Sequence, residues 1–198
     1  MSATIRPAAP AELAAVGELI ALSFDRLEAN HYLVPDAADR LRVMGDFFTL
    51  YTEHAAGHGR VDVVPGPDGP AATAVWFDRT GKMPEPPSYD VRLAVLAGPY
   101  LDRFRALDEL FDAHHPDEAH WHLAFLAVHP WAQRRGLGGA LMAHTHAELD
   151  AAGTPAYLEA TNRDNVRLYR RHGYTDMATF EIPLPDGTPF FRMWRPAA

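Results

Sequence analysis

The stretch LAFLAVHPWAQRRGLGGALMAHTHAEL, residues 123–149, sets an apolar run against a glycine-rich turn and follows the turn with a helical pattern. Residues 123–128 are apolar without alternation, which is typical of a strand buried on both faces. Residues 133–139, QRRGLGG, come next, at the carboxyl end of that strand. The glycines of this turn allow unusual dihedral angles and close approach of the backbone. The stretch therefore predicts a strand, a loop with free N–H groups and a helix.

The loop at residues 133–139 favours a phosphate ligand. Free N–H groups at the start of the following helix can bind phosphate, and a helix amino terminus carries roughly +0.5 of a charge. Arg134 and Arg135 add positive charge, so we expect a pyrophosphate here. The sequence has neither the G-x-G-x-x-G pattern of dinucleotide-binding folds nor the lysine and hydroxyl residue of a P-loop. Glycine-rich turns also join strands to helices without any ligand, so on the glycines alone a purely structural turn is an equal alternative.

Length and composition narrow the fold and the class of function. The chain has 198 residues, 47% of them hydrophobic, which suits one compact domain over residues 1–198. It has no cysteine, so disulfides, thiolate metal sites and cysteine nucleophiles are excluded. The sequence shows no signal-peptide pattern and no run approaching the roughly 18 apolar residues of a membrane span, so we expect a soluble, cytoplasmic protein with no membrane partner. A net charge of −8 argues against nucleic acid as a partner and favours cationic acceptors.

The order of predicted elements indicates an α/β fold. Helical spacing of apolar residues predicts helices, and short β-prone runs bounded by turn residues predict strands. The runs at 59–64 and 71–77 flank a Pro-Asp-Gly turn and predict a hairpin. The other predicted elements are an extended piece at 4–6, helices within 7–24 and 36–55 (the latter capped by Asp36), a mainly helical stretch at 89–114, strand 121–128, helix 138–152, strand 156–160, helix 164–172 and strands 174–182 and 188–194. A mixed sheet with helices on its faces accounts for this order.

Two linked motifs resemble those of one enzyme superfamily. Residues 133–138 read Q-x-x-G-x-G, which resembles the acyl-CoA pyrophosphate loop of the GNAT superfamily of N-acetyltransferases. Residues 157–174, YLEATNRDNVRLYRRHGY, are similar to a second block of that superfamily, N-x-x-N-x-x-L-Y-x-x-x-G-Y. This block and strand 121–128 are most similar to the puromycin N-acetyltransferase group. The region from about residue 30 to 115 matches nothing specific.

The resemblance implies a single-domain GNAT-type fold, with a mixed, mostly antiparallel central sheet flanked by helices. It also implies an enzyme that moves acetyl from acetyl-CoA, its cosubstrate, to the primary amine of a small molecule by direct attack in a ternary complex. A non-catalytic acyl-CoA-binding module and a protein or peptide acetyltransferase remain as alternatives. The oligomeric state stays open, with a homodimer as one option.

Carried over by residue, the resemblance assigns a donor site. Main-chain groups of the strand would pair with the pantetheine arm, N–H groups of the loop would hold the pyrophosphate, and two asparagines would lie near the far end of the arm. The residues of this predicted site are Leu126, Ala127, Val128, Gln133, Arg134, Arg135, Gly136, Leu137, Gly138, Gly139, Asn162 and Asn165. Tyr169 would point its hydroxyl toward the thioester sulfur and protonate the departing thiolate. From the helix alone, a role for Tyr169 in packing against the sheet is an equal alternative.

Attack on the thioester also requires a neutral amine, so a base or a water relay is expected on the other side of the carbonyl. The candidates are His120, His122 and Glu159. His122 stands eleven residues before Gln133, where members of the superfamily with a base on this strand often place it. Histidine in general titrates close to neutral pH, which suits this role. A packed histidine without a chemical role is the alternative.

The histidine-rich stretch HHPDEAHWH, residues 114–122, raises the question of a metal. Its histidines lack the spacing of a standard zinc site, so we expect no metal. We expect the acceptor pocket to come largely from the unmatched region between about residues 30 and 115 and from the final hairpin. Within that region, Tyr32 and Tyr51 are candidates to line it.

Overall fold

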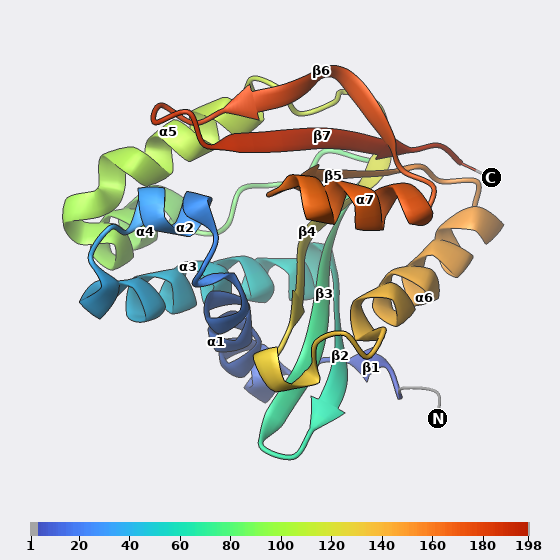
Figure 1. Ribbon diagram of the computed structural model, residues 1–198, viewed down its shortest axis with the longest axis horizontal. Helices are drawn as coiled ribbons and strands as arrows, with labels where there is room; N and C mark the ends of the chain where they lie inside the picture. The colour runs from blue at the N-terminus through green and yellow to red at the C-terminus, as the bar shows by residue number, and fades with distance from the viewer. Residues whose placement is uncertain (1–3, 198) are drawn as a thin grey trace.

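Residues 4–197 of the computed structural model form a seven-stranded sheet in the order β1-β2-β3-β4-β5-β7-β6 (Figure 1). Neighbouring strands are antiparallel except β4 and β5, which are parallel. The last strand of the chain, β7, inserts between β5 and β6. The strands are β1 (Arg6–Pro7), β2 (Gly59–Gly66), β3 (Gly69–Arg79), β4 (His120–Val128), β5 (Ala156–Ala160), β6 (Thr175–Pro183) and β7 (Pro189–Arg195). The predicted α/β fold with a mixed, mostly antiparallel sheet is confirmed.

Helices cover both faces of the sheet and create two apolar cores (Figure 1). One face carries α1 (Leu13–Phe24), α2 (Glu28–Leu33), α3 (Ala37–His58), α4 (Tyr89–Ala97) and α5 (Leu101–Asp112). The other face carries α6 (Leu137–Ala151) and α7 (Arg163–Arg171). Side chains of β3 alternate between the two cores, because successive residues of a strand point to opposite faces. Val75 and Phe77 thus pack beneath the first group of helices, whereas Ala74 and Trp76 pack beneath α6.

Most predicted elements are present within a few residues of their expected bounds. Asp36 caps α3 as expected, since its side chain accepts a hydrogen bond from the Ala38 N–H at 2.9 Å. The helical stretch predicted at 89–114 is divided by a short 3-10 turn at Gly98–Tyr100. The sequence analysis missed α2, which is a six-residue helix and too short for apolar periodicity to identify. No helix within residues 4–197 has both the length and the apolar character needed to cross a membrane.

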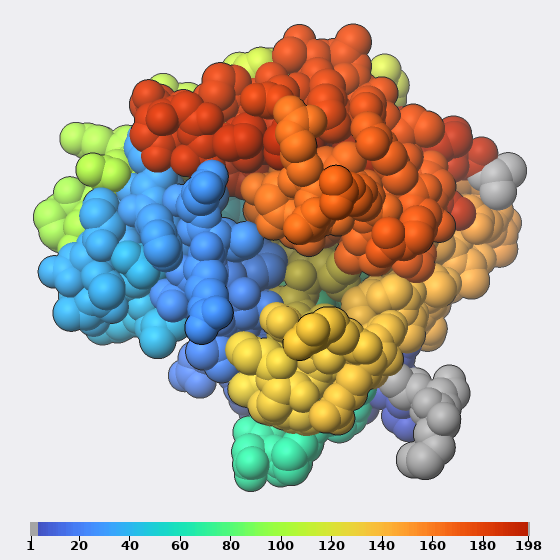
Figure 2. Space-filling model, viewed as in Figure 1, coloured from blue at the N-terminus to red at the C-terminus, as the bar shows by residue number. Residues whose placement is uncertain are grey.

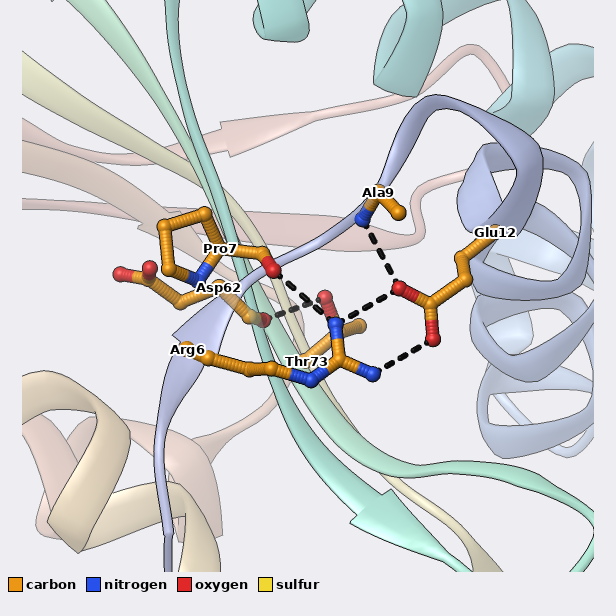
Figure 3. A network of polar contacts seen from close by, with 6 residues as sticks. All are labelled: Arg6, Pro7, Ala9, Glu12, Asp62 and Thr73. Carbon is orange, nitrogen blue, oxygen red and sulfur yellow. Dashed lines mark hydrogen bonds and ion pairs between the residues drawn. The ribbon is translucent and has the colours of Figure 1, made fainter.

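A polar network fastens the first strand to the first helix (Figure 3). The Arg6 guanidinium donates two hydrogen bonds of 2.7 Å to the Glu12 carboxylate, which also accepts the Ala9 N–H at 2.8 Å. The hydrogen bond from Arg6 and that from Ala9 lower the pKa of Glu12 to about 2. Beside them, the Thr73 hydroxyl donates to the Asp62 carbonyl at 2.9 Å and ties β3 to β2. The network holds the chain at the sheet edge where α1 starts its path across the sheet.

Candidate functional site

Strands β4 and β5 separate soon after they meet. Within the described chain, the ladder between them pairs Trp121 with Ala156 and His122 with Tyr157 and goes no further. On its other side, β4 stays paired with β3 as far as Val128. The β3 ladder shifts register opposite residues 123–125, which places a β-bulge in β4 at the point of separation. The main chain of β4 beyond the bulge therefore has an edge without a neighbouring strand.

The surface is hollowed at this separation. Figure 2 shows a recess between the blue α1, the orange α7 and the yellow loop that precedes α6, with the olive atoms of β4 at its base. Leu126, Ala127 and Val128, which we predicted to pair with a pantetheine arm, belong to this part of β4. An extended chain of amide groups could pair with the open edge in the way that a strand would.

The loop before α6, which we predicted to bind a pyrophosphate, has two residues in the left-handed region of the backbone. Arg134 and Gly136 have positive φ angles of 60° and 78°, and Gly136 is the N-cap of α6. Gly136 has no side chain that could cap the helix, so no N-cap side chain pairs with the first N–H groups of α6. Gln133 donates to the Val128 carbonyl at 3.2 Å, which fastens the loop to the end of β4. A Cβ on Gly138 would lie 3.6 Å from the Leu126 side chain, so loop and open strand edge adjoin.

At the start of α7, both asparagines have partners within the protein. The Asn162 side chain caps the helix by accepting the Asn165 N–H at 2.8 Å, and the Asn165 amide donates to the Thr161 hydroxyl at 3.0 Å. Tyr169 lies one turn further along, nearly buried, in the apolar cluster against which Leu126 packs. Burial raises the pKa of the Tyr169 hydroxyl, so it stays protonated at neutral pH. These contacts give Asn162 and Asn165 a structural role whatever they do toward a ligand.

His122 and Glu159 form a pair on the face of the sheet that carries α1 to α5. The His122 Nε2 lies 2.8 Å from a Glu159 carboxylate oxygen, although the residues are 37 positions apart in the chain. Burial raises the pKa of Glu159, but the charge and hydrogen bond of His122 and the hydrogen bond of Tyr157 outweigh it, so the net shift is downward. A carboxylate bound to Nε2 leaves Nδ1 as the free proton acceptor of a neutral imidazole. Within the described residues, Nδ1 is buried and has no hydrogen-bond partner.

A cavity of about 170 Å³ opens beside this pair. Its walls are mostly apolar and rich in aromatic rings, and they come from α1, α2, α3 and α5 on one side and from the sheet on the other. Tyr51 lines it, as the sequence suggested, whereas Tyr32 is absent from the lining. Most wall residues come from the region that matched no motif, so sequence patterns alone could not identify them.

The cavity also has a charged section that the sequence analysis missed. Arg79, Asp108 and Asp112 line it together with His115. Burial raises the pKa of Asp108 to about 6, although the Tyr89 hydroxyl donates to its carboxylate at 2.9 Å and acts in the opposite direction. These residues lie on β3, on α5 and in the loop after α5, and no local pattern links them.

The neighbouring histidines differ from His122 in their surroundings. Burial lowers the pKa of His115 to about 3 and that of His120 to about 4, which keeps both neutral near pH 7. The His120 Nδ1 lies 2.6 Å from the Glu118 carbonyl, and His120 does not line the cavity. Of the three base candidates, His122 and Glu159 line the cavity, whereas His120 does not. Residues 4–197 contain no group of three or more His, Asp or Glu side chains placed to hold a metal ion.

Comparisons with known proteins agree with this geometry. Residues 106–176 match the family model of the acetyltransferase (GNAT) domain. A Corynebacterium glutamicum structure described as histone acetyltransferase HPA2 and related acetyltransferase is 29% identical, with a TM-score of 0.75 over 100% of this chain and 98% of that one. Arylalkylamine N-acetyltransferase 2 from Aedes aegypti is 11% identical, with a TM-score of 0.59 and 98% of both chains covered. Ard1 from Thermoplasma volcanium is 14% identical, with a TM-score of 0.56 over 100% of this chain and 99% of that one.

The last two likenesses concern the fold alone, because their identities are low. The domain match covers the second half of α5 through the start of β6, which includes the open strand, the glycine loop and α7. The 29% identical structure extends the likeness over the whole chain. Together with the splayed strands and the loop, these matches support a GNAT N-acetyltransferase.

Proposed function

We propose that this protein transfers an acetyl group from acetyl-CoA to the primary amine of a small molecule, by direct attack in a ternary complex. The observation that carries the proposal is the buried pair of His122 and Glu159, which lines the cavity. His122 lies on β4, the strand whose open edge would pair with a pantetheine arm. Asp108 and Asp112 in the charged section of the cavity and the net charge of −8 favour arrival of a cationic amine.

On the donor side, the chain offers groups suited to each part of acetyl-CoA, which would supply an acetyl group activated as a thioester. The main chain of Leu126, Ala127 and Val128 would pair with the amides of the arm. The loop N–H groups from Arg134 to Gly139 would bind the pyrophosphate, with the two arginines adding charge. These contacts would hold the thioester at the bulge of β4, close to both His122 and the α7 side of the sheet.

On the acceptor side, His122 takes the proton. As the amine nitrogen bonds to the acetyl carbon and the carbon–sulfur bond breaks, the amine proton passes to Nδ1 of His122. Glu159 holds Nε2, fixes the tautomer and stabilises the imidazolium that forms. Tyr169 donates its hydroxyl proton to the sulfur. Afterwards His122 releases the amine proton to solvent and Tyr169 regains a proton from solvent, so protons balance over the cycle.

The Corynebacterium glutamicum structure is described as a histone acetyltransferase, which favours a protein amine as a second acceptor class. The lined cavity argues for a small molecule instead, because its walls can enclose a whole small acceptor. The likeness to the puromycin N-acetyltransferase group rests on the residues of strand β4 and of the block 157–174.

A double-mutant cycle on the proposed base tests this function. We expect His122→Gln and Glu159→Gln each to lower kcat by about 10²- to 10⁴-fold, and the double variant to cost little more than the worse single one, because the two act as a unit. The readouts are CoA release and product mass over a panel of small amines and peptides. His58→Gln, an exposed histidine at the end of α3, is the matched control and should retain the parental rate. Additive losses, or parental kcat in either single variant while chemistry limits the rate, would contradict the assignment.

A further inference from the structure

The acceptor cavity has the size and the walls of a pocket for one ring. Its volume of about 170 Å³ is close to the roughly 150 Å³ of an apolar cavity that takes benzene in another protein. Edge-to-face pairs organise its walls: the ring centroids of Phe48 and Phe125 are 4.9 Å apart, and those of Phe47 and Tyr51 are 5.0 Å apart. A flat aromatic guest would extend this pattern, since aromatic pairs prefer offset and edge-to-face arrangements. An aliphatic chain would leave these ring faces without such contacts.

Among the described residues, a buried amide in the helical wall has an unpaired hydrogen-bond donor. Asn30, on α2, lines the cavity and is only 4% exposed. Among the described residues, its Nδ2 has no hydrogen-bond partner. Leaving a buried donor unsatisfied costs about 1–3 kcal/mol, so such groups are normally paired. Since Asn30 reaches the cavity from a helix and the His122 and Glu159 pair reaches it from the sheet, a bound ring can lie between the two.

We propose that the acceptor is an arylalkylamine whose single aromatic ring carries an oxygen substituent, and that the Asn30 amide hydrogen-bonds that oxygen while the amine faces His122 and Glu159. The phenol or phenyl ether class fits, because its oxygen accepts a hydrogen bond without adding a charge to the apolar part of the cavity next to Asn30. This inference rests on the proposed function and adds the class of acceptor and the residue that selects it.

Two probes that differ by one oxygen test the inference. Tyramine carries a para hydroxyl, and phenethylamine is the same amine without it. For the parent protein we expect kcat/KM to be at least about ten-fold higher for tyramine, the scale of one satisfied buried hydrogen bond. In Asn30→Leu, which keeps the approximate volume but removes the amide, we expect that preference to fall to about two-fold or less through loss of activity on tyramine alone. Glu28→Gln, an exposed change on the same helix, should keep the parental preference.

Binding measurements separate failure of this inference from failure of the proposed function. With CoA present, tyramine should raise the melting temperature of the parent more than phenethylamine does, and Asn30→Leu should abolish the difference. Equal kcat/KM for both amines, or an equal loss on both in Asn30→Leu, would overturn the assignment of Asn30. Turnover of aliphatic amines or peptides, with neither aromatic amine accepted, would overturn the acceptor class and leave the acetyltransferase function standing. Absence of turnover with every amine would instead count against the proposed function.

Discussion

Tyr169 combines a buried ring with a hydroxyl that has a proposed chemical role. The ring packs edge-to-face on Tyr174 with centroids 5.9 Å apart, and burial raises the pKa of the hydroxyl and keeps it protonated. Tyr169→Phe removes only the proton donor, so we expect kcat to fall by roughly 10²-fold while the affinity for acetyl-CoA and the melting temperature stay close to the parental values. Isothermal titration with CoA and single-turnover kinetics would measure the two effects separately.

Tyr174→Phe is the matched control for this change. It removes a hydroxyl from the same cluster, but that hydroxyl is 3.1 Å from the buried His146 Nε2 and belongs to the protein interior. We expect a loss of about 1 kcal/mol in the free energy of unfolding and a near-parental kcat. A Tyr169→Phe enzyme that turns over at the parental rate, with chemistry shown to be limiting, would remove Tyr169 from the mechanism.

At the scale of elements, two glycines on the helices above the sheet should respond in opposite ways to alanine. Gly17 lies where α1 crosses α3, and a Cβ there would come within 2.7 Å of the Thr49 backbone nitrogen. Gly45 is inside α3 and has nothing within 4 Å of its Cβ position. We expect Gly17→Ala to lower the free energy of unfolding by about 1–3 kcal/mol and Gly45→Ala to raise it by about 0.5–1 kcal/mol. Urea unfolding curves would measure both, and a stable Gly17→Ala variant would mean that the two helices can separate at no cost.

Across the whole molecule, buried histidines make stability depend on acidity. Burial lowers the pKa of His146 from 6.5 to about 4. Between these two values the unfolded chain binds a proton that the folded chain does not, so stability falls as the pH drops from about 6.5 to about 4 and the contribution levels off below that range. His115 and His120 act in the same direction, because burial lowers the pKa of each as well.

Replacing one of these histidines should flatten the acid limb of the stability profile. His146→Gln cannot take up a proton but can still bond the Tyr174 hydroxyl. We expect its free energy of unfolding to change less steeply between pH 6.5 and 4, by at most about 1.4 kcal/mol per pH unit. Denaturant curves across that range, with the exposed His58→Gln as control, would measure the slopes. Identical slopes for His146→Gln and the parent would show that His146 is protonated in the folded state.

The sequence alone predicted most of the helices and strands, and it supplied the residues of the proposed donor half of the candidate site. Apolar periodicity predicted helices such as α3 and α6, because the pattern lies within one element. The loop at 133–139 could also be predicted, because the strand, the glycine turn and the start of the helix are contiguous in the chain. The positive φ angle at position 136 favours glycine there.

Only the tertiary structure decided the acceptor half. His122 and Glu159 were separate candidates in the sequence, and they became one hydrogen-bonded pair because two parallel strands bring them together. No sequence pattern marked Asn30 as a site residue, because it lies on a helix too short to predict. Its proposed role follows from its place in the wall of the cavity that α1, α2, α3 and α5 form against the sheet. A motif records contacts between neighbours in the chain, whereas a cavity is set by side chains from many distant segments, and no local pattern encodes which of them will meet.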